Sequence, residues 1–560
     1  MLVAGIGMSG GAVVARLLRD NPDLRIEVLD RGAPPDPADP TPFTERRLSR
    51  SPGLAVPPEE DWLEFHDGAR TSRVRKWWSA RSAGGGAWLW YGQLSRFRPS
   101  DLDLPDRLAG VPNHQARAWP LSYQDLVPHY EAVEELLRPY GCDYGMDPAT
   151  YRAVECASVV PRPHASHFER VVIDRLRADG LSPYVGQTAL GGRAWDVRPV
   201  SPTTLDTVDA TPPLRARNTW LGLLWDRLPA AGVTVTTQAQ VVRVLVERGR
   251  TRGVEVVVRN ADGELQVQRI RCRAVVLACG PLETVRVLLT SDLSDRARRV
   301  GSSFTLTQER VAYLRTGIPR STDPGDVVAG SFANVVLKDF YEPPPGPGAP
   351  AKCGKFALYD GYAAELPFRH VRNLGLTGGA LRAFLTAERH AYAVKVSFKG
   401  ESIPWDGKRV ELGAGRNAMG VPVSRLVYRP HPYDGEIQRY AASVIGRLAR
   451  ALDARQAVLH DVPAGTELIS AHHHGGAVFG PATDPTAVLS PDCECLDARG
   501  TFVADASVMP TSGATNSSLT TMANAWRVAG LVGDRLAGTA GGRRPAPTLT
   551  AHTGSETTHD

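Results

Sequence analysis

Three consecutive histidines, His472, His473 and His474, are the residues whose types and spacing most directly suggest chemistry. A neutral imidazole accepts a proton near neutral pH because its unperturbed pKa lies close by, so a general base is one interpretation. A zinc site is disfavoured, because successive side chains of an extended segment point to opposite faces and leave at most His472 and His474 on one side. A polar cluster at the surface is the other interpretation, and the run alone leaves both open.

A glycine-rich turn opens the chain. Residues 2–31 are expected to form a strand, a turn with Gly5, Gly7 and Gly10, a helix, and a second strand that ends in Asp30. Glycines at this spacing let the backbone approach a pyrophosphate, which rests on the positive end of the following helix. Asp30 lies about twenty residues further on, where a carboxylate accepts hydrogen bonds from a ribose hydroxyl. The order of these features predicts dinucleotide binding, with a glycine turn in an ordinary βαβ unit as the alternative.

A glycine triplet, 84–86, lies within an aromatic segment that contains four tryptophans and a tyrosine, 77–92. Glycines bring backbone close to a flat object, and the aromatic rings surround it. A flavin ring is one candidate for that object. Aromatic core packing beside a turn is the alternative, and the segment by itself does not decide.

Hydrophobic patterns predict the elements that position these motifs. Helices are expected over 123–137, 219–228 and 436–452, a strand over 233–246 and its hairpin partner over 254–269. The apolar run at 273–291 is expected to be a buried strand and a helix, with the strand in the same parallel sheet as the first one. Alternation between 300 and 455 predicts an antiparallel sheet with one face toward solvent or a substrate, whereas 33–70 is expected to be mostly irregular.

The composition restricts the class of protein. A length of 560 residues suggests two domains, and the 42% hydrophobic and 22% charged residues are typical of a globular protein. The net charge of +5 is spread along the chain, which does not indicate a nucleic-acid partner, and the basic residues are nearly all arginine, a compositional bias. Cys493 and Cys495 are expected to be small buried or half-buried thiols rather than metal ligands. With no signal-peptide pattern and no membrane-spanning run in the sequence, a cytoplasmic location without a membrane partner is expected.

Taken in order, these motifs resemble those of the glucose-methanol-choline (GMC) family of FAD-dependent oxidoreductases. Their sequence pattern is most similar to that of its pyranose oxidase and sugar or polyol dehydrogenase branches. The resemblance runs from Leu2 to Leu536 and is carried by the N-terminal turn, the glycine triplet, the segment VVLACGPLETVRVLLTS and the C-terminal run. It implies a mixed α/β and α+β fold, in which a discontinuous Rossmann-like FAD-binding domain is interleaved with a substrate domain built on an antiparallel sheet. The expected ranges are 1–154 (with a flavin-covering segment at 77–101), 206–299 and 456–538 for FAD binding and catalysis, 155–205 and 300–455 for the substrate domain, and 539–560 for a disordered tail.

The resemblance implies roles for single residues. The register of Gly475 and of Phe479-Gly480 picks out His472 as the catalytic base, and Asn516 falls where the family carries a second histidine or an asparagine. The base would take the hydroxyl proton of an alcohol while a hydride goes to flavin N5, and the amide would hold the same oxygen. His473 and His474 are expected to support the site or the fold.

The resemblance also implies where FAD binds. Asp505 and Ala506 are expected near the pyrophosphate or ribityl chain, and a helix starting near Ser518 would direct its N-H groups toward the flavin. Leu89 stands where members with covalent FAD carry a histidine, so non-covalent FAD is expected. The residues implied in cofactor binding are Gly5, Gly7, Ser9, Gly10, Asp30, Arg31, Gly85, Gly86, Trp90, Val241, Asp505, Ala506 and Ser517, and no metal ligand is expected.

The expected activity is oxidation of an alcohol, which is a sugar, a polyol or a glycosylated metabolite, to a carbonyl, with oxygen or another acceptor taking the electrons. Two departures from the family pattern, Ser517 in place of a proline and no histidine near Gly301, indicate a divergent substrate domain. The alternatives are a non-redox lyase that cleaves cyanohydrins and a catalytically silent flavin-binding protein. An NAD-dependent dehydrogenase would explain 2–31 but not the C-terminal run.

Overall fold

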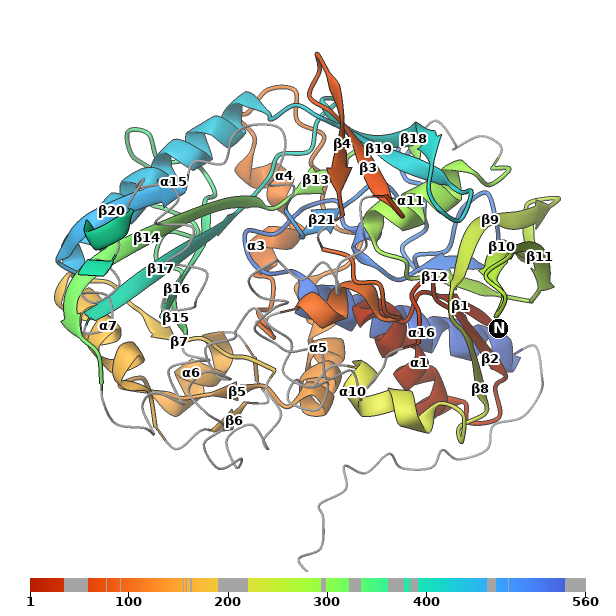
Figure 1. Cartoon of the computed structure of the whole chain (residues 1–560), viewed down its shortest axis with the longest axis horizontal. Helices are drawn as coiled ribbons and strands as arrows, with labels where there is room; N and C mark the ends of the chain where they lie inside the picture. The colour runs from red at the N-terminus through yellow and green to blue at the C-terminus, as the bar shows by residue number, and fades with distance from the viewer. Residues whose placement is uncertain are drawn as a thin grey trace, which may run out of the picture.

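A computed structural model of the chain describes residues 1–34, 59–76, 78–90, 92–154, 156–157, 159–161, 164–189, 220–293, 299–321, 334–360, 377–380, 382–383, 391–460, 470–481 and 483–538. Figure 1 shows a small parallel sheet with its helices at one end and a large antiparallel sheet at the other. The histidine run lies between them. The predicted tail, 539–560, lies outside the described residues, and the domain boundaries expected from the sequence stay predictions.

A parallel sheet carries the nucleotide-binding end. Its order is β22-β12-β1-β2-β8, built from β1 (Leu2–Ala4), β2 (Ile26–Leu29), β8 (Val233–Thr236), β12 (Val275–Leu277) and β22 (Thr501–Val503). Strands from distant parts of the chain therefore share one sheet, and the prediction that the first strand and the 273–291 strand lie together is confirmed.

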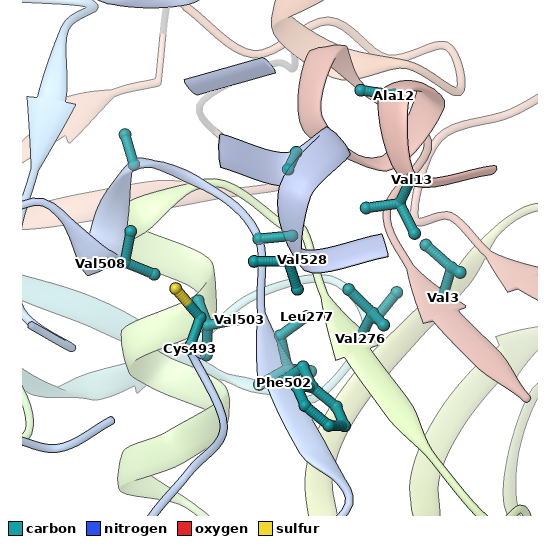
Figure 2. Close-up of a cluster of buried hydrophobic side chains, with 14 of the residues drawn as sticks. Val3, Ala12, Val13, Val276, Leu277, Cys493, Phe502, Val503, Val508 and Val528 are labelled. Atoms are coloured by element: carbon teal, nitrogen blue, oxygen red, sulfur yellow. The ribbon is translucent and has the colours of Figure 1, made fainter. Parts of the chain in front are cut away.

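Helices α1 (Met8–Asp20) and α16 (Ser518–Gly538) cover one face of this sheet. Val3 and Val276 of the sheet lie beside Val13 of α1 and Val528 of α16 in Figure 2, and all four are fully buried. Burying each such side chain stabilises the fold by about 1.5–3 kcal/mol, so the first and the last helix are packed together on one core.

Further helices complete this half. The predicted helix at 123–137 is confirmed as α5 (Tyr123–Leu137), where Ser122 and Asp125 cap each other's backbone. The predicted 219–228 helix is α10 (Trp220–Leu224) followed by the 3-10 turn η2 (Trp225–Arg227), and α11 (Pro281–Leu289) follows β12 as expected. Shorter pieces are η1 (Gly85–Leu89), α3 (Pro99–Leu102), α4 (Leu104–Arg107), α6 (Pro148–Val154), η4 (Ala506–Val508), and the strands β5 (Tyr140–Gly141) and β6 (Val160–Pro161).

A six-stranded antiparallel sheet forms the other half. Its order is β20-β14-β17-β16-β15-β7, from β7 (Tyr184–Val185), β14 (Gln308–Pro319), β15 (Asn334–Leu337), β16 (Gly354–Asp360), β17 (Ala391–Gly400) and β20 (Ala454–His460). Val394, Val396 and Phe398 of β17 are buried in one core with α15 (Pro432–Ala451) and α7 (His167–Ala178). Because side chains alternate along a strand, Lys395 and Lys399 lie on the opposite face.

The antiparallel sheet expected between 300 and 455 is confirmed, but two strands of this range lie outside it. Strands β18 (Lys408–Arg416) and β19 (Pro422–Tyr428) leave the large sheet and join β3 (Trp62–His66) and β4 (Thr71–Arg75), with β19 parallel to β3. Within the segment 33–70, which was expected to be mostly irregular, β3 is a regular strand, while 35–58 lies outside the described residues. Alternation tells which face of a strand is buried, but it does not tell which strand lies beside it.

Two predicted strands are each divided in two. The 233–246 segment breaks at Gln238, whose φ is 51°, so that β8 stays in the parallel sheet while β9 (Ala239–Glu247) enters another. Its expected partner is itself a hairpin, β10 (Arg250–Arg259) and β11 (Leu265–Arg271), closed by a turn at 260–263. Among the helices in the described parts of the chain, none has the length and apolar character needed to cross a membrane.

Candidate active site

The N-terminal glycines form a close turn. Gly5 has a φ of 90°, and a Cβ there would lie 2.5 Å from the carbonyl oxygen of Ala278. A Cβ at Gly10 would lie 1.9 Å from the carbonyl oxygen of Gly5. Helix α1 begins after Gly7 with no side-chain cap from the described residues, and Ser9 is buried in its first turn. The uncapped positive end of this helix fits the pyrophosphate that the motif predicts.

Asp30 joins this turn to the glycine triplet. Its buried carboxylate accepts three backbone N-H groups, among them those of Ile6 at 3.0 Å and Gly84 at 3.3 Å. Burial raises the pKa of Asp30, and these hydrogen bonds oppose that effect. The next residue, Arg31, forms an ion pair with Asp61. Both predicted cofactor residues therefore also hold the protein's own loops together.

The aromatic segment lies against the histidine run. Gly85, with a φ of 49°, and Gly86 begin η1, and Trp90 after it is half-buried. The ring of Trp78 meets that of His473 edge-on, with centroids 4.7 Å apart. Trp77, Tyr91 and the side chains of Trp88 and Leu89 lie outside the described residues.

Asp505 binds together the carboxyl ends of two parallel strands. It accepts the Gly280 N-H at 2.9 Å and the Ser507 N-H at 3.0 Å, and burial raises its pKa. The carbonyl of Ala506 accepts the Gly475 N-H at 3.0 Å, which fixes the end of the histidine run to the same edge of the sheet. Ligands of α/β proteins bind at this edge. Val241, by contrast, is buried in β9 with its carbonyl bonded to Arg286 at 2.6 Å.

The three histidines have different surroundings. His473 and His474 form β21, which pairs with β13 (Thr305–Leu306). His472 Nε2 lies 3.4 Å from Asn516 Nδ2, and His474 Nε2 lies 2.8 Å from Ser517 Oγ. The structure thus brings His472 and Asn516 together, with His473 turned to the other side. The alternation expected of an extended segment is confirmed.

The electrostatics separate His472 from its neighbours. Burial lowers the pKa of His473 to about 3 and holds the pKa of His474 well below its ordinary value. Burial also lowers the pKa of His472, but a hydrogen bond from its Nδ1 to Glu309, 3.2 Å away, opposes the shift. Only His472 combines a charged partner with a partly exposed side chain, 19% accessible.

The sequence interpretation missed Glu309 and its partners. Glu309 lies on β14 opposite Lys399 of β17, with Lys399 Nζ 2.7 Å from Oε1, and Ser470 Oγ donates to the same oxygen at 2.6 Å. Burial would raise the pKa of Glu309, but Lys399 and His472 outweigh it and hold the pKa well below its ordinary range. The sequence contains one sign of this role, because Glu309 is a charged residue on a strand of the sheet expected to face a substrate. Its contact with His472, 163 residues away, depends on the fold and cannot be predicted from the sequence.

Several buried polar atoms around the histidine run have no hydrogen-bond partner among the described residues: Asn516 Oδ1, His473 Nε2, His474 Nδ1, Thr305 Oγ1, Thr307 Oγ1 and Thr515 Oγ1. Leaving a buried polar atom unsatisfied costs about 1–3 kcal/mol, so such a group points to a missing partner. A flavin ring and its hydroxylated chain supply donors and acceptors of this kind, and α16 begins beside them at Ser518. Together with the glycine turn, these residues fit FAD.

Other candidate chemistry finds less support. Within the described ranges, no group of three or more His, Cys, Asp or Glu side chains is arranged to hold a metal ion. Cys493 and Cys495 are buried, as predicted. Cys279 Sγ donates to the carbonyl of Ala4 at 3.3 Å, and burial raises its pKa to about 12, so it is an inert thiol.

Comparison with known proteins gives an independent view. Two family models described as GMC oxidoreductase match the chain, one over residues 215–309 and the other over residues 407–525. The second match contains the histidine run and Asn516.

Two similar proteins match along nearly the whole chain, and a third matches about half of it. The 6'''-hydroxyparomomycin C oxidase of Streptomyces lividus is 26% identical, over 96% of this chain and 91% of that protein. The paromamine 6'-oxidase of Streptomyces fradiae is 24% identical over the same shares. A C-glycoside 3-oxidase of Microbacterium trichothecenolyticum is 28% identical over 54% of each chain.

Solved structures share the fold. Pyridoxine 4-oxidase from Mesorbium loti superposes with a TM-score of 0.61 at 16% identity, covering 95% of this chain and 98% of that one. A formate oxidase superposes with a TM-score of 0.62 at 13% identity over the same shares. The family matches and the full-length relatives show that this chain belongs to the GMC oxidoreductase family and is an FAD-dependent oxidoreductase acting on CH-OH groups.

Proposed function

We propose that the protein oxidises a hydroxyl group of a sugar, a polyol or a glycosylated small molecule to a carbonyl, with His472 as the general base and Asn516 as the group that positions the hydroxyl. The observation that carries this proposal is the approach of His472 Nε2 to Asn516 Nδ2 at 3.4 Å, from positions 44 residues apart.

The two side chains have complementary abilities. A lowered pKa keeps His472 neutral at neutral pH, so its imidazole is ready to accept the hydroxyl proton. Asn516 does not titrate, and its amide N-H would donate to the substrate oxygen, while its Oδ1, which has no hydrogen-bond partner among the described residues, can accept a further hydrogen bond. Bound FAD supplies the hydride acceptor. The base and the amide would hold the reacting carbon in one orientation.

FAD is proposed to bind at the edge of the parallel sheet where the glycine turn and Asp505 lie. Gly5, Gly7, Ser9 and Gly10 would approach the pyrophosphate, and Asp30 and Arg31 the ribose. The remaining proposed contacts are Gly85, Gly86, Trp90, Val241, Asp505, Ala506 and Ser517. FAD is proposed to be non-covalent because Leu89 has no nucleophilic atom.

The substrate class rests on similarity. Relatives that match over nearly the full length are named as a 6'''-hydroxyparomomycin C oxidase and a paromamine 6'-oxidase, and a third is named as a C-glycoside 3-oxidase. These names favour a carbohydrate-like alcohol as the substrate of this chain, with oxygen or another compound as the electron acceptor.

Anaerobic mixing of the purified yellow protein with a panel of sugars, polyols and aminoglycosides tests the proposal through loss of flavin absorbance. His472→Ala is expected to slow bleaching by about 10²- to 10⁴-fold, the usual contribution of a general base, with FAD still bound. His66→Ala on β3 is the matched control and should leave the rate unchanged. Bleaching at the wild-type rate in His472→Ala would exclude His472 as the base, and cyanide release from cyanohydrins without bleaching would indicate a lyase.

A further inference from the structure

We propose that Glu309 is a positioning residue for His472: its carboxylate, paired with Lys399, fixes the proton of the neutral imidazole on Nδ1 and leaves Nε2 as the base. The inference rests on the proposed function, because it takes His472 as the group that accepts the substrate proton.

The contacts at both ring nitrogens agree on this tautomer. Nδ1 lies 3.2 Å from Glu309 Oε1, and an ionised carboxylate only accepts hydrogen bonds, so Nδ1 must carry the proton. Nε2 lies 3.4 Å from Asn516 Nδ2, and an amide nitrogen only donates, so Nε2 must offer its lone pair. The lone pair therefore points to the place where Asn516 would hold a hydroxyl.

The carboxylate itself is held in place and kept charged. Lys399 stands directly across from Glu309 on β17, and its ammonium lies 2.7 Å from Oε1. Ser470 Oγ donates to Oε1 at 2.6 Å and also accepts the backbone N-H of His472 at 3.1 Å. One serine thus connects the backbone of the base to the carboxylate that orients its ring.

Glu309 and Lys399 act on His472 with opposite sign. The negative charge of Glu309 favours the imidazolium, whereas the positive charge of Lys399 disfavours it. Among the described residues, other titratable groups near the ring are Lys355 on β16, which also disfavours the imidazolium, and the neutral side chains of His473 and His474.

The carboxylate also serves the proton transfer. When Nε2 takes the proton of the substrate O-H bond, the ring becomes positively charged with its Nδ1 proton still in place. The carboxylate of Glu309 then faces the imidazolium cation instead of the neutral imidazole. Its negative charge stabilises this product of the transfer, although Glu309 does not itself take a proton. Removing the carboxylate charge should therefore weaken the base as well as loosen its orientation.

The test measures protonation of His472 without turnover. Diethyl pyrocarbonate modifies only unprotonated imidazole. Peptide mass spectrometry measures how much His472 is modified at each pH, and the midpoint of this curve is the pH at which half of the His472 side chains in the holoenzyme are protonated. Glu309→Gln should move the midpoint to lower pH than in the wild type, and Lys399→Met should move it to higher pH. Lys395→Met, on the same strand and face, is the matched control and should leave it unchanged.

Flavin bleaching by the best alcohol provides the second measurement. Glu309→Gln should slow it by about tenfold or more at every pH with FAD content unchanged, because a correctly oriented base is worth about 10²- to 10⁴-fold. Glu309→Asp keeps the charge and should recover part of the rate, and the midpoint shift in Lys399→Met still tests the inference if Glu309→Gln does not fold.

The outcomes separate this inference from the proposed function. If the midpoints of Glu309→Gln and Lys399→Met do not change, or change in the same direction, the positioning role is overturned, even if a sugar bleaches the flavin of the wild type. Opposite shifts in a protein that no alcohol bleaches would support the tautomer and refute the oxidation.

Discussion

Three identical side chains in a row are given different chemistry by what touches each one. His473 lies against the Trp78 ring, His474 bonds to the Ser517 hydroxyl, and only His472 meets a carboxylate. Because burial alone depresses the pKa of an imidazole, the two histidines without a charged partner are fixed as neutral groups. The position of Glu309 on a neighbouring sheet therefore decides which histidine is suited to be a base.

The glycine turn can be tested at a single atom. In Gly10→Ala the new Cβ would lie 1.9 Å from the carbonyl oxygen of Gly5, so the turn must open and its N-H groups move. FAD binding is expected to weaken by about tenfold or more, the effect of about 1.4 kcal/mol. Flavin content after purification and titration of the apoprotein measure it.

Gly110→Ala is the control for this substitution, because a Cβ at Gly110 meets nothing within 4 Å. Equal FAD affinity in the two variants would mean that the close contact at Gly10 does not shape the cofactor site.

At the scale of elements, the sequence predicts what is local and misses what depends on partners. The unit β1-α1-β2 is predicted because its glycines, helix period and terminal acid all lie within 2–31. The strands between 300 and 455 are predicted as strands but placed in one sheet, since nothing in β18 or β19 marks β3 as their neighbour. For the same reason, His472 and Asn516 can be predicted because they lie in a family motif. The pairing of Glu309 with Lys399 cannot be predicted, because it depends on the register between two strands of the sheet.

The break between β8 and β9 at Gln238 can be tested by substitution. Gln238 has a φ of 51°, a left-handed conformation that costs a residue with a Cβ about 1–2 kcal/mol. In Gln238→Gly this strain is relieved, but glycine loses roughly 0.5–1 kcal/mol more backbone entropy on folding. Because the relief is the larger of the two, the substitution is expected to raise the thermal midpoint. Differential scanning fluorimetry of the holoenzyme measures the shift.

Thr237→Gly is the matched control, since Thr237 is not among the described residues with positive φ and gains no relief. It should lower the thermal midpoint, and a lower midpoint in Gln238→Gly as well would show that the break does not store strain.

Across the whole molecule, the rare lysines are not distributed like the other basic residues. The chain has only seven lysines among 65 basic residues, and five of them, Lys76, Lys338, Lys352, Lys355 and Lys408, are at most 7% exposed. The remaining two are half-buried on β17. A bias toward arginine explains the surface, but a compact ammonium fits narrow buried sites that a guanidinium does not. In a chain with this bias, a lysine marks a buried or half-buried position, and this signal is present in the sequence itself.

Lys352 is the lysine that joins the two halves of the molecule. It is fully buried between Asp101 of α3 and Glu401, which follows β17, and lies 3.3 Å from Glu401 Oε2. Glu401 in turn accepts the Ser512 N-H at 3.1 Å, four residues before Asn516. The ion cluster therefore connects the substrate sheet, the α3 segment and the loop that carries the positioning amide.

Lys352→Met would leave two buried carboxylates without their shared cation, which typically costs about 3–5 kcal/mol. The thermal midpoint of Lys352→Met, measured by differential scanning fluorimetry of the holoenzyme, should therefore lie well below that of the wild type. Arg252→Met removes an exposed cation paired with Glu247 and should change the midpoint little. An equally small change in Lys352→Met would show that the ion cluster does not stabilise the fold.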